Sequence, residues 1–522
     1  MSSKEKINNK ITFKSYNMNQ QSLPMSLEDL IPESHVVRVI NEYIERMDIE
    51  PLLERYKGGG RASYHPKMML KVLIYAYTQK IYSSRKIAKA IRETIPFMWL
   101  SGNNFPDFRT INRFRSSNMK NITEQVFANV LAMLIEDGYV KYEQYFVDGT
   151  KIEANSNRYK FVWAKSTKRY KKQLGEKVHE LFEEINELNA REDEEYEGLD
   201  LDELGERSTL TSKKLEQKVN ELNDRLAGKP QAKKTIRLFR ILRTNCLPRL
   251  KKYEQYEEIL GDRKNFSKTD HDATFMRMKE DHMKNGQLKP GYNIQIGTED
   301  QFILGYSIHQ NRTDTGCLID HLEDIKHLNG KVPETIIADA GYGSEENYLY
   351  LYSNGHDPYI KFNTYHKEQL KKTKQDPFWS GNWPYVEEAD EFICPQGKRL
   401  IYKYTKHGET AHGYETETRV YECTDCSACP VKDQCTKASG NRQLQRNIRL
   451  EQFRDDARKR LQSDEGRQIY GKRKIEVEPV FGHIKWNREF KRFLLRGLDK
   501  VKIEWGIMCI AHNMMKVATA RV

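Results

Sequence analysis

The sequence lacks the long apolar segments with which a chain enters or crosses a membrane. No stretch of about 18 uncharged apolar residues occurs in it. Its first segment, Met1 to Lys10, is polar and charged and has no apolar centre like that of a secretory signal peptide. These two absences predict a cytoplasmic protein that makes no membrane contact.

Cysteine is scarce as well: the chain has 8 in 522 residues, which excludes the disulfide framework of a small secreted domain. Four of them are nevertheless crowded together, at Cys423, Cys426, Cys429 and Cys435. Thiolates two residues apart suit tetrahedral Zn²⁺, while an iron–sulfur cluster is the alternative that also uses closely spaced cysteines. We predict a structural zinc site here, with Cys394 as a further candidate ligand.

The excess of positive charge is small for the size of the chain, because 87 Lys and Arg face 75 Asp and Glu. The basic residues are clustered, however, in segments such as Lys168–Lys172, Arg249–Lys252 and Lys472–Lys474. Such clusters suit the phosphates of nucleic acids, although a solvated surface is the simpler alternative. Hydrophobic residues make up 38% of the chain, enough for the cores of several compact units.

After a polar tail over residues 1–24, the pattern of residues 25–138 predicts helices. Pro66 opens a long helix with apolar periodicity, and a second helix over Arg85–Ile95 ends at Pro96. Short helices with a basic last member resemble a helix-turn-helix unit that reads the DNA major groove, and a small bundle with a charged face is the alternative. Three arginines lie on or next to the third predicted helix: Arg109, Arg113 and Arg115.

The following regions alternate strands and helices. Residues 139–163 contain a short apolar strand that ends at Asp148. Residues 266–378 contain a β-hairpin, helices and two further strands, of which one ends at Asp339. This order predicts an α/β domain with a mixed sheet, to which residues 446–522 add C-terminal helices.

Two insertions interrupt this predicted domain. In residues 164–265, apolar residues alternate spacings of three and four from Leu174 to Leu188 and from Leu215 to Leu226, on either side of the acidic stretch Glu192–Glu206. Two such segments joined by a polar turn predict an antiparallel helical hairpin with a structural role. The second insertion, residues 379–445, contains the cysteine cluster.

Three carboxylates stand out from these elements. Asp148 and Asp339 follow apolar strands, where the active sites of open α/β sheets gather, although aspartate is also a common turn residue. Glu478 precedes Pro479, so we expect it at a helix entrance, with Lys485 two turns along the same face. Phosphodiester cleavage uses two Mg²⁺ ions held mainly by carboxylates. We therefore predict a site for two Mg²⁺ ions, which Mn²⁺ can replace.

Taken together, these residues resemble the DDE transposases of bacterial insertion sequences, over nearly the whole chain. The motifs that carry the resemblance are Tyr82–Ala88, Asn112–Arg115, Phe146–Asn155, Gly291–Gln295, Ala338–Tyr342, Val477–Gly482 and Lys485. The resemblance implies an RNase H-like catalytic core behind a helical DNA-binding region. It also implies that Asp148, Asp339 and Glu478 are catalytic, metal-binding acids and that Lys485 contacts a DNA phosphate.

One spacing departs from the family's signature, in which Tyr, Arg, Glu and Lys are separated by two, three and six residues. Tyr470 and Arg473 keep their interval, as do Glu478 and Lys485, but the join between the two pairs is one residue too long. The resemblance implies that Tyr470 and Arg473 contact DNA, and this different spacing leaves their roles undecided. Lys474, four residues before the glutamate, is an alternative on the same helix.

Glu476 and Glu489 are the alternative late acids. Glu476 lies nine residues before Lys485, which places it about 180° away around an ideal helix. Glu489 follows the same lysine by four residues, where a surface ion pair is the simpler interpretation. We therefore expect Glu478 to be the catalytic glutamate.

The resemblance implies a transposase that binds the terminal inverted repeats of its element, nicks the ends by hydrolysis and joins a 3′-hydroxyl to target DNA. We expect a homodimer on double-stranded DNA, associated with the nucleoid in a bacterial cytoplasm. Two alternatives stay open: a nuclease that never joins strands, and an inactive DNA-binding protein derived from a transposase. Retention of all three acids argues against the inactive protein.

Overall fold

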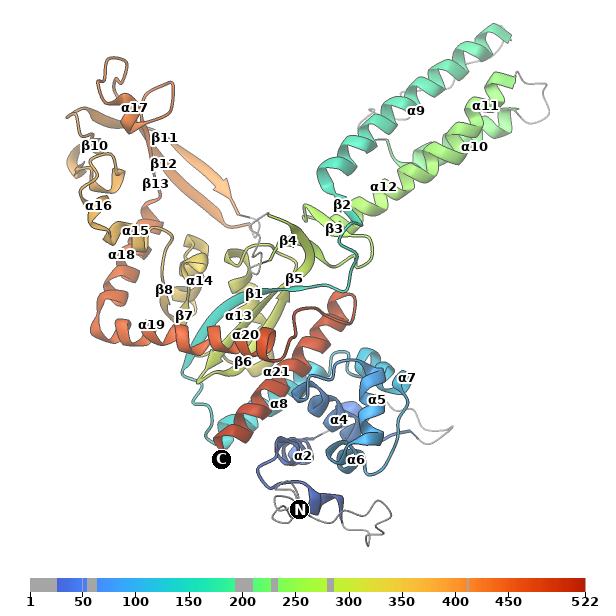
Figure 1. Ribbon diagram of the computed structural model, residues 1–522. Helices are drawn as coiled ribbons and strands as arrows, with labels where there is room; N and C mark the ends of the chain where they lie inside the picture. The colour runs from blue at the N-terminus through green and yellow to red at the C-terminus, as the bar shows by residue number, and fades with distance from the viewer. Residues whose placement is uncertain are drawn as a thin grey trace, which may run out of the picture.

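The computed structural model describes residues 26–48, 50–53, 63–192, 210–226, 233–278, 286–410 and 413–521. The predicted tail over residues 1–24 and the acidic stretch from residue 193 onward lie outside these ranges. Figure 1 shows a central α/β body, an N-terminal group of helices beside it, and two projections that extend from the body in different directions. Within the described ranges, no helix is long and apolar enough to cross a membrane.

The N-terminal helices form where the sequence predicts them. Pro96 differs from the prediction, because it opens α6 as well as ending the helix before it; its fixed φ and missing N–H suit a first helical turn. Nearly every side chain of the central helix α4 is buried, which anchors the group on the body. The elements are η1 (Leu27–Leu30), α2 (Val36–Arg46), α3 (Glu50–Leu53), α4 (Pro66–Thr78), α5 (Ser84–Glu93), α6 (Ile95–Ser101), α7 (Phe108–Arg113), the π-helix η2 (Phe114–Asn118) and α8 (Thr123–Glu136).

A mixed sheet forms the centre of the body, in the order β4-β5-β1-β7-β8, with β6 also paired to β5. Strand β1 is antiparallel to β5 and parallel to β7, and β7 is parallel to β8. The predicted α/β class with a mixed sheet is confirmed. The strands are β1 (Gln144–Glu153), β4 (Thr274–Arg277), β5 (Leu288–Glu299), β6 (Phe302–His309), β7 (Thr335–Ala338) and β8 (Asp357–Ile360).

Strand β1 is longer than the sequence indicated. We expected it to end at Asp148, whereas it continues to Glu153 because its second half pairs with β5, from Gly149↔Gln295 to Glu153↔Gly291. The polar residues of this half satisfy backbone hydrogen bonds in the ladder although they break the apolar pattern. Asp148 is therefore an inward-facing strand residue and not a turn residue.

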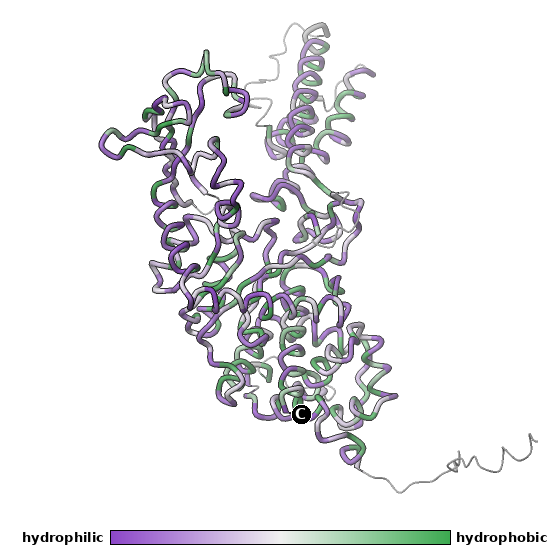
Figure 2. Tube along the Cα trace, turned by 60° about the vertical axis from the view of Figure 1, so that its left-hand side comes forward, coloured by the Kyte–Doolittle hydropathy of each residue, from purple (hydrophilic) through white to green (hydrophobic). Residues whose placement is uncertain are grey.

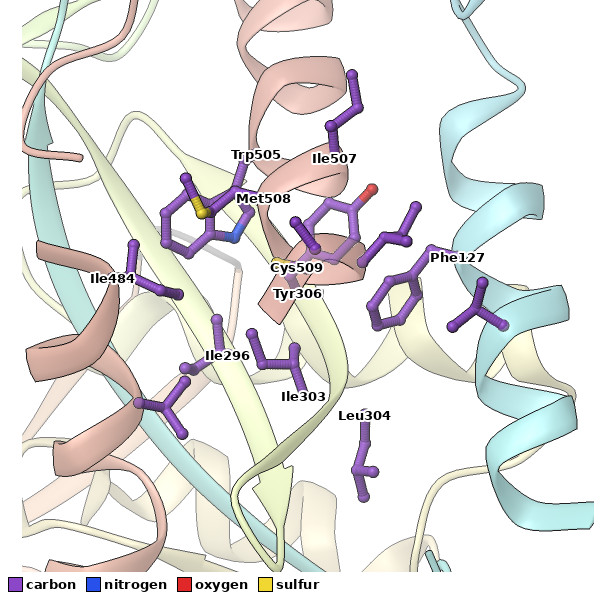
Figure 3. Packing of buried hydrophobic residues seen from close by; sticks show 14 of the residues in the cluster. Phe127, Ile296, Ile303, Leu304, Tyr306, Ile484, Trp505, Ile507, Met508 and Cys509 are labelled. Carbon is purple, nitrogen blue, oxygen red and sulfur yellow. The ribbon is translucent and has the colours of Figure 1, made fainter. Parts of the chain in front are cut away.

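Helices α13 (Leu318–Asn329), α14 (Glu345–Ser353) and α21 (Leu498–Ala520) pack around the sheet. Helix α21 contacts α4, α8 and β6, so it joins the N-terminal helices to the sheet. Figure 3 shows Trp505 and Met508 of α21 among the aliphatic side chains of β5 and β6, with Phe127 of α8 near Tyr306. At Gly506 an added Cβ would collide with Tyr306, so only glycine allows this close approach.

The first projection is a helical arm that begins after β2 (Phe161–Trp163) and ends before β3 (Asn265–Ser267), two strands that pair with each other. We expected a two-helix hairpin, and this is wrong in part. The arm contains α9 (Ala164–Glu192), α10 (Ser212–Leu226), α11 (Lys233–Ile241), the π-helix η4 (Leu242–Cys246) and α12 (Leu247–Leu260). Helix α9 packs on α11 and α12, and α10 packs on α12, because the last helices add their own apolar stripe to one shared core. Hydrophilic residues make up much of the arm's trace in Figure 2.

The second projection contains the clustered cysteines, from Cys394 to Cys435, and a sheet that the sequence did not reveal, in the order β13-β12-β11-β10-β9. Its elements are α15 (Tyr365–Gln369), α16 (Lys371–Lys374), η7 (Ser380–Asn382), β9 (Tyr385–Val386), η8 (Glu387–Ala389), β10 (Glu391–Ile393), β11 (Arg399–Glu409), β12 (Glu415–Cys423), α17 (Lys432–Cys435) and β13 (Gln443–Arg446). The chain then returns to the body through α18 (Ile448–Gln462), α19 (Asp464–Glu476), α20 (Glu478–Gly482) and the π-helix η9 (His483–Asn487).

Candidate active site

The central sheet brings two of the predicted acids together. Strands β1 and β7 run parallel with Phe146 opposite Ile337, so Asp148 and Asp339 each come two residues later on neighbouring strands. Because strand side chains alternate between faces, both acids point to the same face of the sheet. The Asp148 side chain is 9% exposed and that of Asp339 is 40% exposed, so the pair spans from the interior to the surface.

Helices α19 and α20 add the third acid and a cation. The Arg473 guanidinium of α19 lies 3.5 Å from an Asp148 carboxylate oxygen and 3.6 Å from one of Asp339, both measured from Nη2. Its Nη1 lies 3.5 Å from Glu478 Oε1. One buried guanidinium is thus shared by three carboxylates from three separate elements. All three contacts are within the distance of an ion pair.

The other late acids stand elsewhere. Glu476 is buried, and its carboxylate accepts a hydrogen bond of 2.9 Å from the backbone N–H of Gln301, in the turn between β5 and β6. Gln301 has a φ of 63°, so this contact holds a left-handed turn residue in place. Glu489 is exposed and also has a positive φ, 57°. Of the three late glutamates, Glu478 is the one that the structure places beside the two aspartates.

A polar network that the sequence analysis did not assign lies next to Asp148. The Asp314 carboxylate accepts hydrogen bonds from Asn293 Nδ2 at 2.8 Å and Gln295 Nε2 at 3.0 Å, and Tyr342 donates to Gln295. At Gly149 an added Cβ would collide with both Gln295 and Asp314. The signal in the sequence was the pair of amides two residues apart on β5, which face the same side of the sheet.

Tyr342 is a buried hydroxyl in the middle of this group. Burial raises its pKa well above the usual range, and the nearby charges of Asp148, Asp314 and Asp339 raise it further. The hydroxyl therefore stays protonated and donates its hydrogen bond. This contact fixes Gln295 and, through it, the orientation of the Asp314 carboxylate.

The basic residues predicted around Glu478 occupy different settings. Lys474 is exposed at the end of α19, and Tyr470 is half-buried, with burial raising its pKa to about 12. Lys485 is 5% exposed and lies in the π-helix η9. The expected two regular turns from Glu478 to Lys485 are therefore wrong, because the chain changes from α to π geometry between them.

The three acids fit a divalent cation by their chemistry, because carboxylate oxygens are the ligands that Mg²⁺ prefers. In their present arrangement they surround the Arg473 guanidinium. Among the described residues, no three His, Cys, Asp or Glu side chains are placed close enough together to hold a metal ion. Asp148, Asp339 and Glu478 are nevertheless the side chains that would hold the cation.

The arginines of the N-terminal helices divide into two kinds. Arg109 and Arg113 are exposed on α7 and line a cavity of about 470 Å³ together with Arg85 and serines 83, 84, 116 and 117. Arg115 is 2% exposed, and it donates to the Tyr82 carbonyl at 2.7 Å and to the Tyr77 hydroxyl at 3.2 Å. The Arg115 side chain therefore points into the core, because it lies in the π-helix η2, and its predicted contact with DNA stays a prediction.

The cysteines of the second projection gather as predicted from their spacing, although not as a closed metal site. Cys423 and Cys426 are buried in one small cluster, against which Cys394 and Cys435 pack. Burial and the neighbouring Cys426 raise the pKa of Cys423 to about 12. Within the described residues, no three of these thiols are placed close enough together to hold a metal ion.

Comparison with known protein families gives two matches. Residues 393–518 match the family described as Transposase DDE domain, and residues 25–117 match the family described as Transposase domain (DUF772). The first match contains Glu478 and Arg473, and the second contains Arg109 and Arg113. No curated protein and no solved structure matches the chain. The sheet that carries Asp148 and Asp339 lies outside both matches.

Proposed function

We propose that the chain is a DDE transposase of the insertion-sequence type, which cuts DNA at the ends of its element and joins the freed ends to target DNA; the two transposase family matches support this proposal. The observation that carries this proposal is the convergence of Asp148, Asp339 and Glu478 on one guanidinium. Three acids at such short range repel one another unless cations stand among them. A site of this kind is suited to cation-dependent phosphoryl transfer.

The cation of the proposed reaction is Mg²⁺, as two ions that Mn²⁺ can replace. When bound, the ions stabilise the attacking and leaving oxygens of an in-line displacement. In the first step a water oxygen attacks the phosphorus, and the 3′-oxygen of the element end leaves. In the second step this 3′-hydroxyl attacks a phosphorus of target DNA, and the target's own 3′-oxygen leaves. Asp148 and Asp339 are held by the sheet, and Glu478 is held by α20, the helix that follows the one carrying Arg473.

The proposed catalytic core is RNase H-like. Its support is a sheet in which the antiparallel strands β6, β5 and β1 are followed by the parallel strands β7 and β8. The two aspartates lie within β1 and directly after β7, where the parallel pairing of these two strands ends. In open α/β sheets, ligands bind at this edge.

Binding of the terminal inverted repeats is proposed for the N-terminal helices. Arg109 and Arg113 are exposed, and together with Arg85 they line one cavity. Exposed cations supply affinity for phosphates. Tyr470, Lys474 and Lys485 are proposed contacts nearer the acids, on a homodimer bound to double-stranded DNA in the bacterial nucleoid.

The deciding experiment is incubation of the protein with duplexes carrying the element's ends and with Mg²⁺, followed by mapping of every cut and joined product. The proposal expects nicks at the element ends and strand-joined DNA. Nicks without joined product would replace it with a nuclease. Binding without nicks in Mg²⁺ or Mn²⁺ would replace it with an inactive DNA-binding protein.

A structural zinc ion is proposed for the second projection. The support is the gathering of Cys394, Cys423, Cys426 and Cys435 in one cluster, with Cys429 close to them in the sequence. Sulfur ligands at these spacings favour Zn²⁺ over the oxygen-preferring Mg²⁺. Elemental analysis of the purified protein tests this assignment separately from any assay of DNA cleavage.

A further inference from the structure

A cavity of about 440 Å³ lies beside the three acids, and its lining is basic and aromatic. It lies at the end of β8 and against α15, α18 and α19, and its lining includes the basic residues Lys361, His366 and Arg467 and the rings of Tyr365 and Tyr470. None of these lining residues is acidic. A cavity whose charged groups are all basic is suited to an anion.

The topology of the sheet places this cavity next to the reaction centre. Ala338 of β7 pairs in parallel with Ile360 of β8, so the next residues, Asp339 and Lys361, lie side by side at the carboxyl edge of the sheet. At Gly343 an added Cβ would collide with the Lys361 carbonyl, so the loop after Asp339 passes directly against this residue. The cavity is thus one strand away from a predicted catalytic acid.

Lys361 is a cation surrounded by other cations and by rings. Its ammonium lies 4.1 Å from the ring centroid of Tyr470 and 5.2 Å from that of Tyr365. Among the described residues no carboxylate lies within ion-pair distance of it, and its hydrogen-bond partner is His366 Nε2 at 3.3 Å. Burial lowers the pKa of Lys361, and the nearby charges of Arg473 and Lys474 lower it further. An anion in the cavity would offset both the burial of this ammonium and its repulsion by Arg473 and Lys474.

We propose that this cavity binds a phosphate of the DNA backbone next to the scissile one, and that Lys361 is the residue that contacts it. The inference rests on the proposed function, because DNA is the polyanion that the neighbouring acids would cut. A phosphate held here, beside the attacked one, fixes the path of the strand across the carboxyl edge of the sheet. Lys474, which is exposed at the end of α19, adds a positive charge on the same side.

The test combines a lysine substitution with single neutralised phosphates. Lys361→Gln is compared with the wild type on end duplexes that each carry one uncharged methylphosphonate near the scissile bond, and binding is measured without divalent metal. The wild type loses about tenfold in affinity at one position, as expected for one charge-assisted contact. Lys361→Gln binds unmodified DNA about tenfold more weakly, and it is insensitive to the modification at that position. The slope of its log affinity against log salt concentration also becomes shallower, by the amount expected for the loss of about one phosphate contact.

Controls separate this contact from general effects of charge and folding. Lys371→Gln, an exposed lysine on α16 outside the cavity, should bind like the wild type. Lys361→Arg should restore most of the affinity, and unchanged melting temperatures exclude misfolding. The proposal is overturned if Lys361→Gln binds unmodified DNA like the wild type or keeps the wild-type sensitivity at every position. If the wild type instead binds end DNA without cutting it in Mg²⁺, the proposed function fails while the phosphate contact is still measured.

Discussion

Arg473 and Glu478 are five residues apart, and their side chains meet with 3.5 Å between Nη1 and Oε1. In an unbroken helix, five residues correspond to about 140° of rotation, which would separate the two side chains. Helix α19 ends at Glu476 and α20 begins at Glu478, with Val477 between them. The chain has one residue more between Arg473 and Glu478 than the family signature has. Because the helix is interrupted at Val477, the two side chains still meet despite this extra residue.

Replacement of Arg473 by glutamine should leave three carboxylates without their shared cation. Because their mutual repulsion is relieved by any added cation, Arg473→Gln should bind Mn²⁺ on the order of tenfold more tightly than the wild type, in the absence of DNA. Titration calorimetry measures this. Lys472→Gln, an exposed residue on the same helix, is the matched control. Equal or weaker Mn²⁺ binding by Arg473→Gln would show that the guanidinium does not compete with metal.

Asp148→Asn and Asp339→Asn should each reduce cleavage of end DNA by about 1,000-fold or more, because each removes a charged ligand of the proposed ions. DNA binding should change little, since lysines and arginines supply most of the affinity. Single-turnover cleavage and binding on the same duplex separate the two effects. Cleavage at the wild-type rate by either variant would remove that aspartate from the site.

The three late glutamates should respond differently to the same change. Glu478→Gln should eliminate both cleavage and strand joining, because Glu478 alone among them stands beside the aspartates. Glu489→Gln and Glu476→Gln should retain most activity, the latter because a glutamine oxygen also accepts the hydrogen bond from Gln301. An inactive Glu476→Gln that is folded, together with an active Glu478→Gln, would reverse the assignment.

Buried histidines should make stability depend on pH. Tyr145, His321, Ser307 and His309 form a hydrogen-bonded chain, and burial lowers the pKa of His309 to about 4 and of His321 to about 3. Both are neutral when folded but take up a proton in the unfolded chain below about pH 6.5. The stability they contribute is therefore complete above pH 6.5 and is lost as the pH falls toward 4.

Each histidine should reduce the free energy of unfolding by roughly 2 kcal/mol between pH 7 and pH 5. Denaturant unfolding at the two pH values measures the loss. His321→Gln should reduce this pH dependence by roughly 2 kcal/mol, and His407→Gln, at an exposed position on β11, should leave it unchanged. The same pH dependence in His321→Gln as in the wild type would contradict the assignment.

The purified protein should carry about one zinc ion per chain, because four clustered thiolates make one tetrahedral site. Elemental analysis measures the metal, and the double variant Cys426→Ser with Cys429→Ser should lose it. Cys246→Ser, a buried cysteine of the helical arm, is the control that should retain it. A brown protein with iron and sulfide would replace zinc by an iron–sulfur cluster. Unchanged metal content in the double variant would exclude the cluster as its site.

The sequence by itself determined the parts of this protein that depend on local pattern. Apolar runs ending in an acid predicted strands β1 and β7, periodicity predicted most helices, and Pro479 predicted the interruption at Glu478. These features follow from backbone chemistry within a few residues. The α/β class followed from the order of such elements along the chain.

Only the tertiary structure decided which side chains meet. Arg473 lies among acids from three elements, Asp314 is held by amides of β5, and Lys361 stands beside Asp339, and no spacing in the sequence encodes these contacts. Likewise, Arg115 looked like its neighbour Arg113 until a π-helix turned it into the core. A side chain's direction depends on the packing of distant segments, and packing is a property of the folded chain as a whole.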